Sequence, residues 1–408
     1  MPGAALVTRE GTDRNMQKGT RLLSFSERAV EDLFSNFWHA DEQGGHFQDY
    51  CMVVVWEVGM ALIGLETAYL VTEQESLRER FTQEWRYLHK LIPPDEMTAP
   101  HSACNPACDD AAWTAMTLMT FYRMTGDEEA LRLAARTVRR SYDFWQDGHP
   151  SQGLWYRFGE DKTPAAYGWH KSVYCAGLLL SALEYQQITA GTPLEDPKLL
   201  EDTLSLYRWV EQYLRRDGEK RIGSRILQTN DKLYYTDFTD CPSKGIFEPT
   251  GCDHPQYIYE AGSCSSLFGN TAMAAINALL FDMSGDNAYL TKAVETANAL
   301  ALPPYNHNGV FLNDRDAWTN AAFMGAFTRL VLTRPGISPQ LLQLVRGTGL
   351  QIAENCRTPA GYYRPEWSGG CRWTGYERAH TKTEQLNTTA TSAHMIFAAG
   401  LAEKLGLF

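Results

Sequence analysis

Two stretches of the chain, residues 113–138 and 272–301, carry the same succession of features. In each, apolar residues recur at helical spacing, the pattern breaks at Met-Thr-Gly-Asp or Met-Ser-Gly-Asp, and a second helical pattern follows. The glycine of each break can end a helix in the left-handed conformation, and the aspartate after it can cap the next helix. The repeated unit is therefore predicted to be a helical hairpin.

Weaker copies of this hairpin lie at 56–85, 172–210 and 320–352, and a final single helix is predicted at 389–405. The copies recur at intervals of roughly 60 residues, which is longer than the repeat of most solenoid proteins. Each hairpin can fold locally, but it must bury its apolar face against its neighbours. The pattern therefore predicts hairpins packed side by side.

Long connections rich in Trp and Tyr separate the hairpins, at 146–171, 231–263 and 357–381. Loops of this length in a compact domain are usually functional or disordered, and their aromatic content argues against disorder. An open superhelix would contain similar hairpins, but six hairpins with alternate connections lengthened suit a closed ring with those connections around one mouth. We predict an all-α fold, a single (α/α)6 barrel over 21–408, preceded by a flexible segment at 1–20.

Composition and charge exclude some classes of partner. The 408 residues are 44% hydrophobic and 12% aromatic, which is enough for a large core. The formal net charge of -12 disfavours nucleic acid, because binding phosphates needs clustered Lys and Arg. The longest apolar run, at 52–65, is interrupted by Glu57 and is too short to cross a bilayer. We predict neither a nucleic-acid partner nor a membrane span.

The N-terminus and the cysteines bear on the cellular compartment. The first residues contain no basic segment followed by an apolar stretch, so the chain as written is expected in the cytoplasm. A secreted protein is expected if a signal was removed. Nine cysteines are too few for a disulfide scaffold at this length, and most are expected to be buried thiols. In a secreted form, Cys104 and Cys108 are a candidate for oxidation.

One segment, 252–264, contains residue types that ligate metals, namely two cysteines, an aspartate and a histidine. It lacks the paired CxxC or HxxxH spacing of zinc sites, so we predict no metal site. The chain also lacks a Walker-type loop, a dinucleotide fingerprint and a GxSxG elbow, so nucleotide-dependent and serine-hydrolase chemistries have no support. Hydrolysis by carboxylates needs no cofactor, and none is predicted.

Asp109 and Asp110 stand side by side shortly before Trp113, where an amphipathic helix begins. One interpretation is capping, since carboxylates accept hydrogen bonds from the free amides of a helix N-terminus and suit its dipole. The other is glycoside hydrolysis, in which one carboxyl protonates the leaving oxygen and the other attacks the anomeric carbon. Two close carboxylates repel, which keeps one of them protonated, as a general acid requires. The two interpretations are compatible.

Aromatic residues crowd the long connections that we expect around the mouth. Flat aromatic side chains can bury the apolar faces of sugar rings while nearby polar groups bind the hydroxyls. Any single aromatic is more often a packing residue, but the set favours a carbohydrate groove. Glu260, before the helix that holds Asn270, is expected to face a substrate or to cap that helix. The predicted substrate-binding residues are Trp113, Trp155, Tyr156, Arg157, Lys171, Tyr235, Asp237, Tyr259, Glu260 and Trp367.

Several of these motifs together resemble glycoside hydrolase family 76, the endo-α-1,6-mannanases and their fungal relatives. "DDAAW" at 109–113 followed by "MTGD" carries the likeness first, and "GLWYRF" at 153–158 is similar to the family's Gly-rich segment with paired aromatics. Lys171 matches the Lys that starts the family's next inner helix, and 257–293 and 323–331 resemble two later helices. The likeness therefore extends over most of the chain.

The resemblance implies an (α/α)6 barrel and a retaining mechanism in which Asp109 is the nucleophile and Asp110 the general acid/base. The sequence departs from the family where Glu260 and Ala261 replace an Asn-Gln pair, and where Met324 replaces a Lys. These departures concern mannan specificity more than hydrolysis. By this resemblance, the predicted substrate is an oligosaccharide or polysaccharide with α-1,6-linked mannose.

Three other functions remain open at this point. A transglycosylase would use the same carboxylates and pass the glycosyl group to a sugar instead of water. A sugar epimerase on the same barrel would rely on histidines across the cavity. A glycan-binding protein without catalysis would use Asp109 and Asp110 only as a helix cap, so replacing them would change stability and leave no activity to lose.

Overall fold

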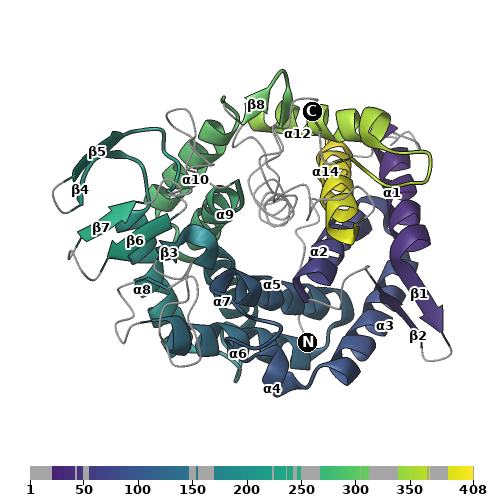
Figure 1. Ribbon diagram of the computed structural model, residues 1–408, viewed down its shortest axis with the longest axis horizontal. Helices are drawn as coiled ribbons and strands as arrows, with labels where there is room; N and C mark the ends of the chain where they lie inside the picture. Colours follow the sequence, from purple (N-terminus) through teal and green to yellow (C-terminus); the bar gives the residue numbers. More distant parts are fainter. Residues whose placement is uncertain are drawn as a thin grey trace.

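The structure is a ring of inner helices enclosed by a ring of outer helices (Figure 1). The structure is a computed structural model. Each described hairpin contributes one helix to the inner ring and one to the outer ring. The prediction of an all-α (α/α)6 barrel is confirmed. The structure describes residues 21–41, 44–48, 55–146, 153–154, 170–222, 225–235, 237–241, 246–249, 267–303, 305–311, 339–364, 367 and 385–407.

The described inner helices follow one another around the ring. Helix α2 packs on α5 and on α14, α5 packs on α7, and α7 packs on α9. The first helix of the hairpin predicted at 320–352 lies outside the described residues. The inner helices are α2 (Val55–Thr72), α5 (Cys108–Thr125), α7 (Ala176–Thr189), α9 (Leu267–Ser284) and α14 (Leu386–Lys404).

The outer helices are amphipathic and cover the inner ring with their apolar faces. Helix α6, for example, buries ten of its residues and leaves its charged residues on the outside. A short helix α4 (Pro94–Met97) precedes α5, and a π-helical turn at Ile352–Cys356 follows α12. The outer helices are α1 (Arg21–Phe37), α3 (Glu75–Leu91), α6 (Glu128–Trp145), α8 (Pro197–Tyr213), α10 (Asn287–Leu300) and α12 (Pro339–Gln351). The sequence analysis did not predict α1.

The connections alternate in length, as the sequence predicted. Inner helices lead to outer helices through short turns, such as 126–127 and 285–286. Outer helices lead to the next inner helix through long segments, such as 146–175 and 214–266. Because each hairpin is antiparallel, every described inner helix begins at the same end of the barrel, and the long connections gather there.

The predicted turn chemistry is present in both strong copies of the hairpin. Gly126 and Gly285 are left-handed, with φ of 76° and 72°. The side chain of Asp127 accepts a hydrogen bond from the Glu129 amide, and Asp286 accepts one from Ala288, both at 2.9 Å. The prediction of helix end and helix cap at each turn is therefore confirmed.

Short antiparallel strands occupy parts of the connections, which the sequence analysis treated as irregular. A sheet of order β3-β6-β7 joins residues that are far apart in the sequence, and such pairing leaves no local periodicity to detect. The strands are β1 (Trp38–Asp41), β2 (Gly44–Phe47), β3 (His170–Ser172), β4 (Gly218–Ile222), β5 (Arg225–Thr229), β6 (Asp237–Cys241), β7 (Ile246–Pro249), β8 (Asn306–His307) and β9 (Val310–Phe311).

Small residues allow the inner helices to approach closely. A Cβ atom on Gly59 of α2 would overlap the hydroxyl of Thr117 on α5, and one on Gly400 of α14 would press on Ser26 of α1. In α14, every residue from Leu386 to Ala402 is buried. A helix that is buried on all sides needs side chains that are apolar or that find hydrogen-bond partners within the protein. This explains the many Ala, Ser and Thr residues of α14.

An ion cluster joins three inner helices near their C-terminal ends. Arg123 of α5 donates to Glu66 of α2 at 2.5 and 2.7 Å and to Glu184 of α7 at 3.1 Å. Thr120 donates to Glu66 at 3.1 Å and accepts from Arg123 at 2.9 Å. The charge of Glu66 raises the pKa of Arg123 despite its burial, so the guanidinium stays charged. The cluster holds α2, α5 and α7 in register.

The two ends of the chain close the ring. Arg357, after α12, donates to both carboxylate oxygens of Asp32 on α1 at 2.7 Å, and Tyr363 donates to the same carboxylate at 3.0 Å. Lys404, at the end of α14, donates to the carbonyl oxygens of Leu70 and Val71 at the end of α2. The last elements are thus fastened to the first.

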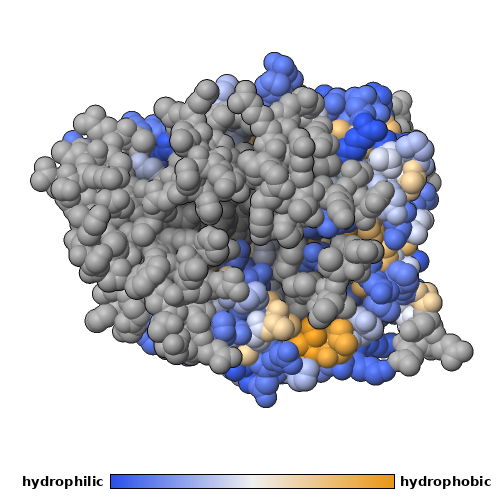
Figure 2. Space-filling model, in the orientation of Figure 1, coloured by the Kyte–Doolittle hydropathy of each residue, from blue (hydrophilic) through white to orange (hydrophobic). Residues whose placement is uncertain are grey.

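The surface seen in Figure 2 is mostly hydrophilic where the structure describes it, with its largest hydrophobic patch near the lower edge. No helix among the described residues is both long and apolar enough to cross a membrane.

The buried imidazole of His394, on α14, should make stability depend on pH. Burial lowers its pKa to about 3, against the charge of Glu66, and its Nε2 lies 3.0 Å from the Thr67 hydroxyl. Between pH 6.5 and 3 the unfolded chain binds this proton and the folded chain does not, so stability falls as pH falls. In His394→Gln, this decrease should be smaller by up to about 1.4 kcal/mol per pH unit.

The measurement is urea unfolding at pH 7, 6, 5 and 4.5. The matched control is His89→Gln, because His89 is exposed, and this variant should keep the wild-type slope. An unchanged slope in His394→Gln would mean that this imidazole is not the group that couples folding to protons.

Candidate functional site

Asp109 and Asp110 occupy the first turn of α5, at the end of the barrel where the long connections gather, and both are half-buried. Asp110 Oδ2 accepts a hydrogen bond from the Ala107 amide at 3.1 Å, and Asp109 Oδ1 accepts one from the Asp110 amide at 3.1 Å. The predicted capping is therefore present. A carboxylate has about four lone-pair positions, so one such bond does not prevent a chemical role.

The segment before α5 is held by Asn105, which is fully buried. Its Nδ2 donates to the carbonyl oxygens of Met97 and Ala99 at 2.8 and 3.0 Å, and its Oδ1 accepts from the Thr114 hydroxyl at 2.8 Å. The sequence analysis missed this role, because an asparagine before proline indicates only a turn.

Trp113 lies one helical turn beyond Asp109 and therefore on the same side of α5. Only 6% of its surface is exposed. Most of its side chain is therefore buried in this structure. The prediction that it contacts substrate stays a prediction.

Polar residues also stand at the starts of other inner helices. Glu57 lies in the first turn of α2 and is half-buried, and Asn270 and Asn387 lie in the first turns of α9 and α14 and are buried. Because parallel helices direct their N-termini to this end, their free amides and dipoles make it favourable for anions. The site therefore suits carboxylates and electron-rich oxygen atoms.

The segment that leads to Tyr235 and Asp237 is fixed from two sides. Asn270, at the start of α9, accepts from the Tyr234 amide at 2.7 Å, and the Tyr235 amide donates to the Leu214 carbonyl oxygen at 2.8 Å. Tyr235 is 8% exposed, and the guanidinium of Arg216 lies 5.0 Å from the centre of its ring. Tyr234 and Tyr235 are thus held by hydrogen bonds to two different parts of the fold.

Tyr234 is the centre of a buried polar network that supports this segment. Its hydroxyl donates to Glu211 at 2.5 Å and accepts from Arg215 at 2.8 Å and from Asn277 at 3.3 Å. Burial and the charge of Glu211 raise the pKa of Tyr234 well above its usual value, so the hydroxyl keeps its proton.

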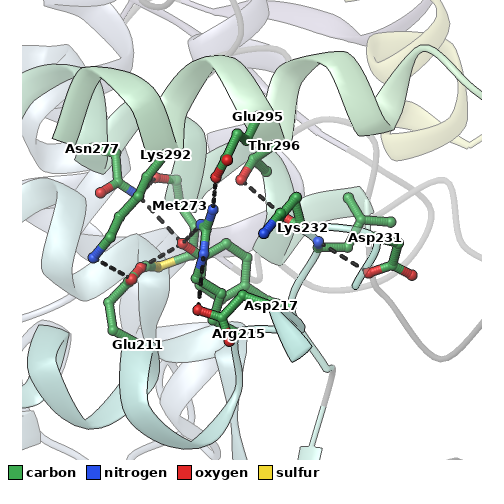
Figure 3. Close-up of polar contacts among 12 residues, drawn as sticks. Glu211, Arg215, Asp217, Asp231, Lys232, Met273, Asn277, Lys292, Glu295 and Thr296 are labelled. Atoms are coloured by element: carbon green, nitrogen blue, oxygen red, sulfur yellow. Dashed lines mark hydrogen bonds and ion pairs between the residues drawn. The ribbon is translucent and has the colours of Figure 1, made fainter. Parts of the chain in front are cut away.

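The charged members of this network are paired with a further helix. Figure 3 shows Lys292 and Glu295, both from α10, pointing toward Glu211 and Arg215, each pair at 2.6 Å. The outer helices α8 and α10 and the inner helix α9 therefore meet at Tyr234. The network is structural, and it fixes Tyr234, which lies three residues before Asp237 in the sequence.

Lys171 and Asp237 lie on neighbouring strands. In the antiparallel pair of β3 and β6, Lys171 is opposite Phe238 and Ser172 is opposite Asp237. The expectation that Lys171 opens an inner helix is wrong, because α7 begins only at Ala176, after a strand and a 3₁₀ turn. The structure nevertheless brings these two predicted residues close together in one sheet.

Trp367 is placed differently from the prediction. Only 1% of its surface is exposed, and its indole Nε1 donates to the Ser392 hydroxyl on α14 at 2.9 Å. It has no ring face open to a sugar, so its role in this structure is to pack the last long connection against α14. Tryptophan is large and apolar. Where it does not stack on a ligand, it is usually buried with its indole N–H hydrogen-bonded.

The other predicted substrate-binding residues lie outside the described residues. They belong to the connections between α6 and α7 and between α8 and α9, which lead to the same end of the barrel in chain order. These substrate-binding residues are Trp155, Tyr156, Arg157, Tyr259 and Glu260. The segment 252–264, which contains residue types that can ligate metals, also lies outside the described residues.

The cysteines near the site are thiols. Cys104 and Cys108 are buried and free, as are Cys175 and Cys356. Burial and the charge of Glu96 raise the pKa of Cys104 to about 11, so it stays protonated at neutral pH. None of these four cysteines forms a disulfide, and this includes the pair beside the aspartates. Among the described side chains, no three His, Cys, Asp or Glu residues gather as metal ligands.

A family profile described as Glycosyl hydrolase family 76 matches residues 23–239, which is more than half of the chain. The match includes the aspartate pair and ends within β6. A search of curated proteins gives no match.

Solved structures share the fold along nearly the whole chain. The GH76A α-1,6-mannanase from Salegentibacter sp. HEL1_6 is 15% identical, with a TM-score of 0.67, over 93% of this chain and 99% of that one. An inactive variant of it, with two consecutive aspartates replaced by asparagine, was solved with α-1,6-mannotriose (16%, TM-score 0.66, 93% and 99%). Dfg5 from Chaetomium thermophilum, in complex with glucosamine, is 12% identical, with a TM-score of 0.67, over 96% and 93%.

The Tyr234 network generates a stability prediction. Tyr234→Phe removes the shared hydroxyl and leaves Glu211 and Arg215 with unmatched hydrogen-bonding capacity, so the free energy of unfolding should fall by about 1–3 kcal/mol. The measurement is urea unfolding at pH 7.

The matched control is Tyr289→Phe. Tyr289 is a half-buried tyrosine on α10 whose hydroxyl makes no hydrogen bond among the described residues, and the change should stay within about 0.5 kcal/mol. Equal effects of the two variants would show that the network does not support this part of the fold.

Proposed function

Because this chain belongs to glycosyl hydrolase family 76, we propose that it is a retaining glycoside hydrolase that cleaves α-1,6-mannosidic linkages in mannan or mannooligosaccharides. The observation that carries the proposal is the adjacent pair Asp109 and Asp110, half-buried in the first turn of an inner helix at the loop-bearing end. A structural relative named as an α-1,6-mannanase is inactive when two consecutive aspartates are replaced, which supports the same role for this pair.

In the proposed reaction, Asp109 attacks the anomeric carbon of the mannosyl residue while Asp110 donates its proton to the leaving glycosidic oxygen. The glycosidic bond breaks and a glycosyl ester forms on Asp109. Asp110, now ionised, then removes a proton from water, which attacks the anomeric carbon and releases Asp109. The two inversions give net retention. The assignment of roles to the two residues follows the order in the family.

The surroundings of the pair fit this chemistry. The N-terminal amides of parallel helices favour the ionised Asp109 and the negative charge that develops on the leaving oxygen. In the proposed site, Tyr235, Lys171 and Asp237 help to bind the sugar, together with Trp113 and the predicted residues outside the described ranges. Trp367 is buried against α14 and has no part in sugar binding in this proposal. The proposed substrate is an uncharged glycan, so the site needs no basic groove to bind it.

The aspartate pair gives the direct test of this proposal. Purified wild-type protein should cleave linear α-1,6-mannooligosaccharides, and NMR during the reaction should show the α-anomer as the first product. Asp109→Asn and Asp110→Asn should each lower kcat/KM by about 10³-fold or more. Both variants should remain folded, because asparagine also accepts a hydrogen bond from a helix N-terminus.

Asp127→Asn is the matched control, since it changes an aspartate cap at the opposite end of the same helix hairpin and should keep wild-type activity. Mass spectrometry in 18O-water separates hydrolysis from transfer to a second sugar. Full activity in Asp109→Asn, or a β-anomer as first product, would refute the retaining mechanism. Binding of mannotriose without cleavage by the wild type would leave a glycan-binding protein.

A further inference from the structure

The hydrogen bond between Thr114 and Asn105 lies directly beneath the proposed proton donor. Thr114 is four residues after Asp110, so the two side chains lie on the same face of α5, one turn apart. The Thr114 hydroxyl donates to Asn105 Oδ1 at 2.8 Å, and both residues are 0% exposed. The segment that precedes α5 is therefore pinned against the face of the helix that carries Asp110.

Every polar atom of Asn105 is used in this arrangement. Its side-chain amide spans the carbonyl oxygens of Met97 and Ala99, its backbone amide donates to Ser102, and its carbonyl oxygen accepts from His101 at 2.7 Å. A fully satisfied buried asparagine allows only one path for the loop around it. The hydroxyl of Thr114 is the contact that ties the Asn105 side chain to α5.

The loop in turn holds the carboxylate. Two residues after Asn105, the Ala107 amide donates to Asp110 Oδ2 at 3.1 Å. The position of that amide depends on where Asn105 is fixed, because only Pro106 and its rigid backbone separate them. A displacement of the loop would therefore rotate the Asp110 carboxyl group or remove its partner.

We propose that Thr114 and Asn105 are positioning residues that set the Asp110 carboxyl group for proton transfer to the leaving oxygen. The inference rests on the proposed function, and it adds residues that touch no substrate. A merely structural role of the same hydrogen bond would lower stability and affect all substrates alike. A positioning role affects only reactions that need the proton.

The discriminating experiment compares two substrates with wild type and Thr114→Val, a variant of nearly the same shape without the hydroxyl. α-1,6-Mannotriose has a poor leaving group and requires the acid, whereas 2,4-dinitrophenyl α-1,6-mannobioside has a good leaving group and does not. The quantity measured is kcat/KM, because it reports the first chemical step. We expect Thr114→Val to lose about tenfold or more on mannotriose and no more than about twofold on the dinitrophenyl substrate.

Two further variants keep the test independent of folding. Thr114→Ser retains the hydroxyl and should restore wild-type kcat/KM on mannotriose. Thr117→Val removes a buried hydroxyl from the same helix, but that hydroxyl has no hydrogen-bond partner among the described residues, so activity on both substrates should be unchanged. Circular dichroism and urea unfolding establish the folded fraction for each variant.

Equal losses on the two substrates in Thr114→Val, or no loss on either, would overturn the positioning role while leaving the proposed function intact. Cleavage of neither substrate by the wild type would instead overturn the proposed function and, with it, this assignment. If Thr114→Val does not fold, Thr114→Ala serves in its place, since it also removes the hydroxyl and leaves room for a water molecule at Asn105 Oδ1. It should show the same selective loss on mannotriose.

Discussion

The close approach of the inner helices is the constraint on which the rest of this structure depends. Gly59 of α2 leaves room for Thr117 of α5, and α14 is buried on every side along most of its length. Helices packed in this way cannot present charged side chains along their middle without enclosing a partner for each charge. Reactive groups are therefore confined to the helix ends, where the backbone itself is unsatisfied.

The alternation of short and long connections then makes the two ends of the barrel chemically different. At one end the inner helices begin, and their free amides favour the carboxylates of Asp109, Asp110 and Glu57. Toward the other end, Arg123 and Lys404 lie close to helix C-termini, where the dipole favours positive charge, and the carboxylates of Glu66 and Glu184 there are paired with Arg123. The distribution of charge thus follows from topology, and it stabilises the fold while preparing one end for chemistry.

The sequence could predict what is local and repeated. The turns at Gly126 and Gly285 have their own glycine and aspartate signals, and the Asp109-Asp110 pair stands out because the two residues are adjacent. It could not predict what depends on distant pairing: Lys171 enters a strand because β6 lies beside it, and Trp367 is buried because Ser392 offers its indole a partner. Asn105 was visible only as a turn residue, since its partner Thr114 is nine residues away on a helix face.

Asp110 shows why capping and catalysis need not compete. In the proposed mechanism, the ionised Asp110 accepts the Ala107 amide, and this hydrogen bond would weaken when the carboxyl group carries the proton for the leaving oxygen. Under that proposal, the end of α5 is capped less tightly while Asp110 is protonated and more tightly after the proton has left. The positioning proposed for Asn105 and Thr114 would keep the geometry constant while this hydrogen bond changes strength, which gives a physical reason for a fully satisfied asparagine two residues before Ala107.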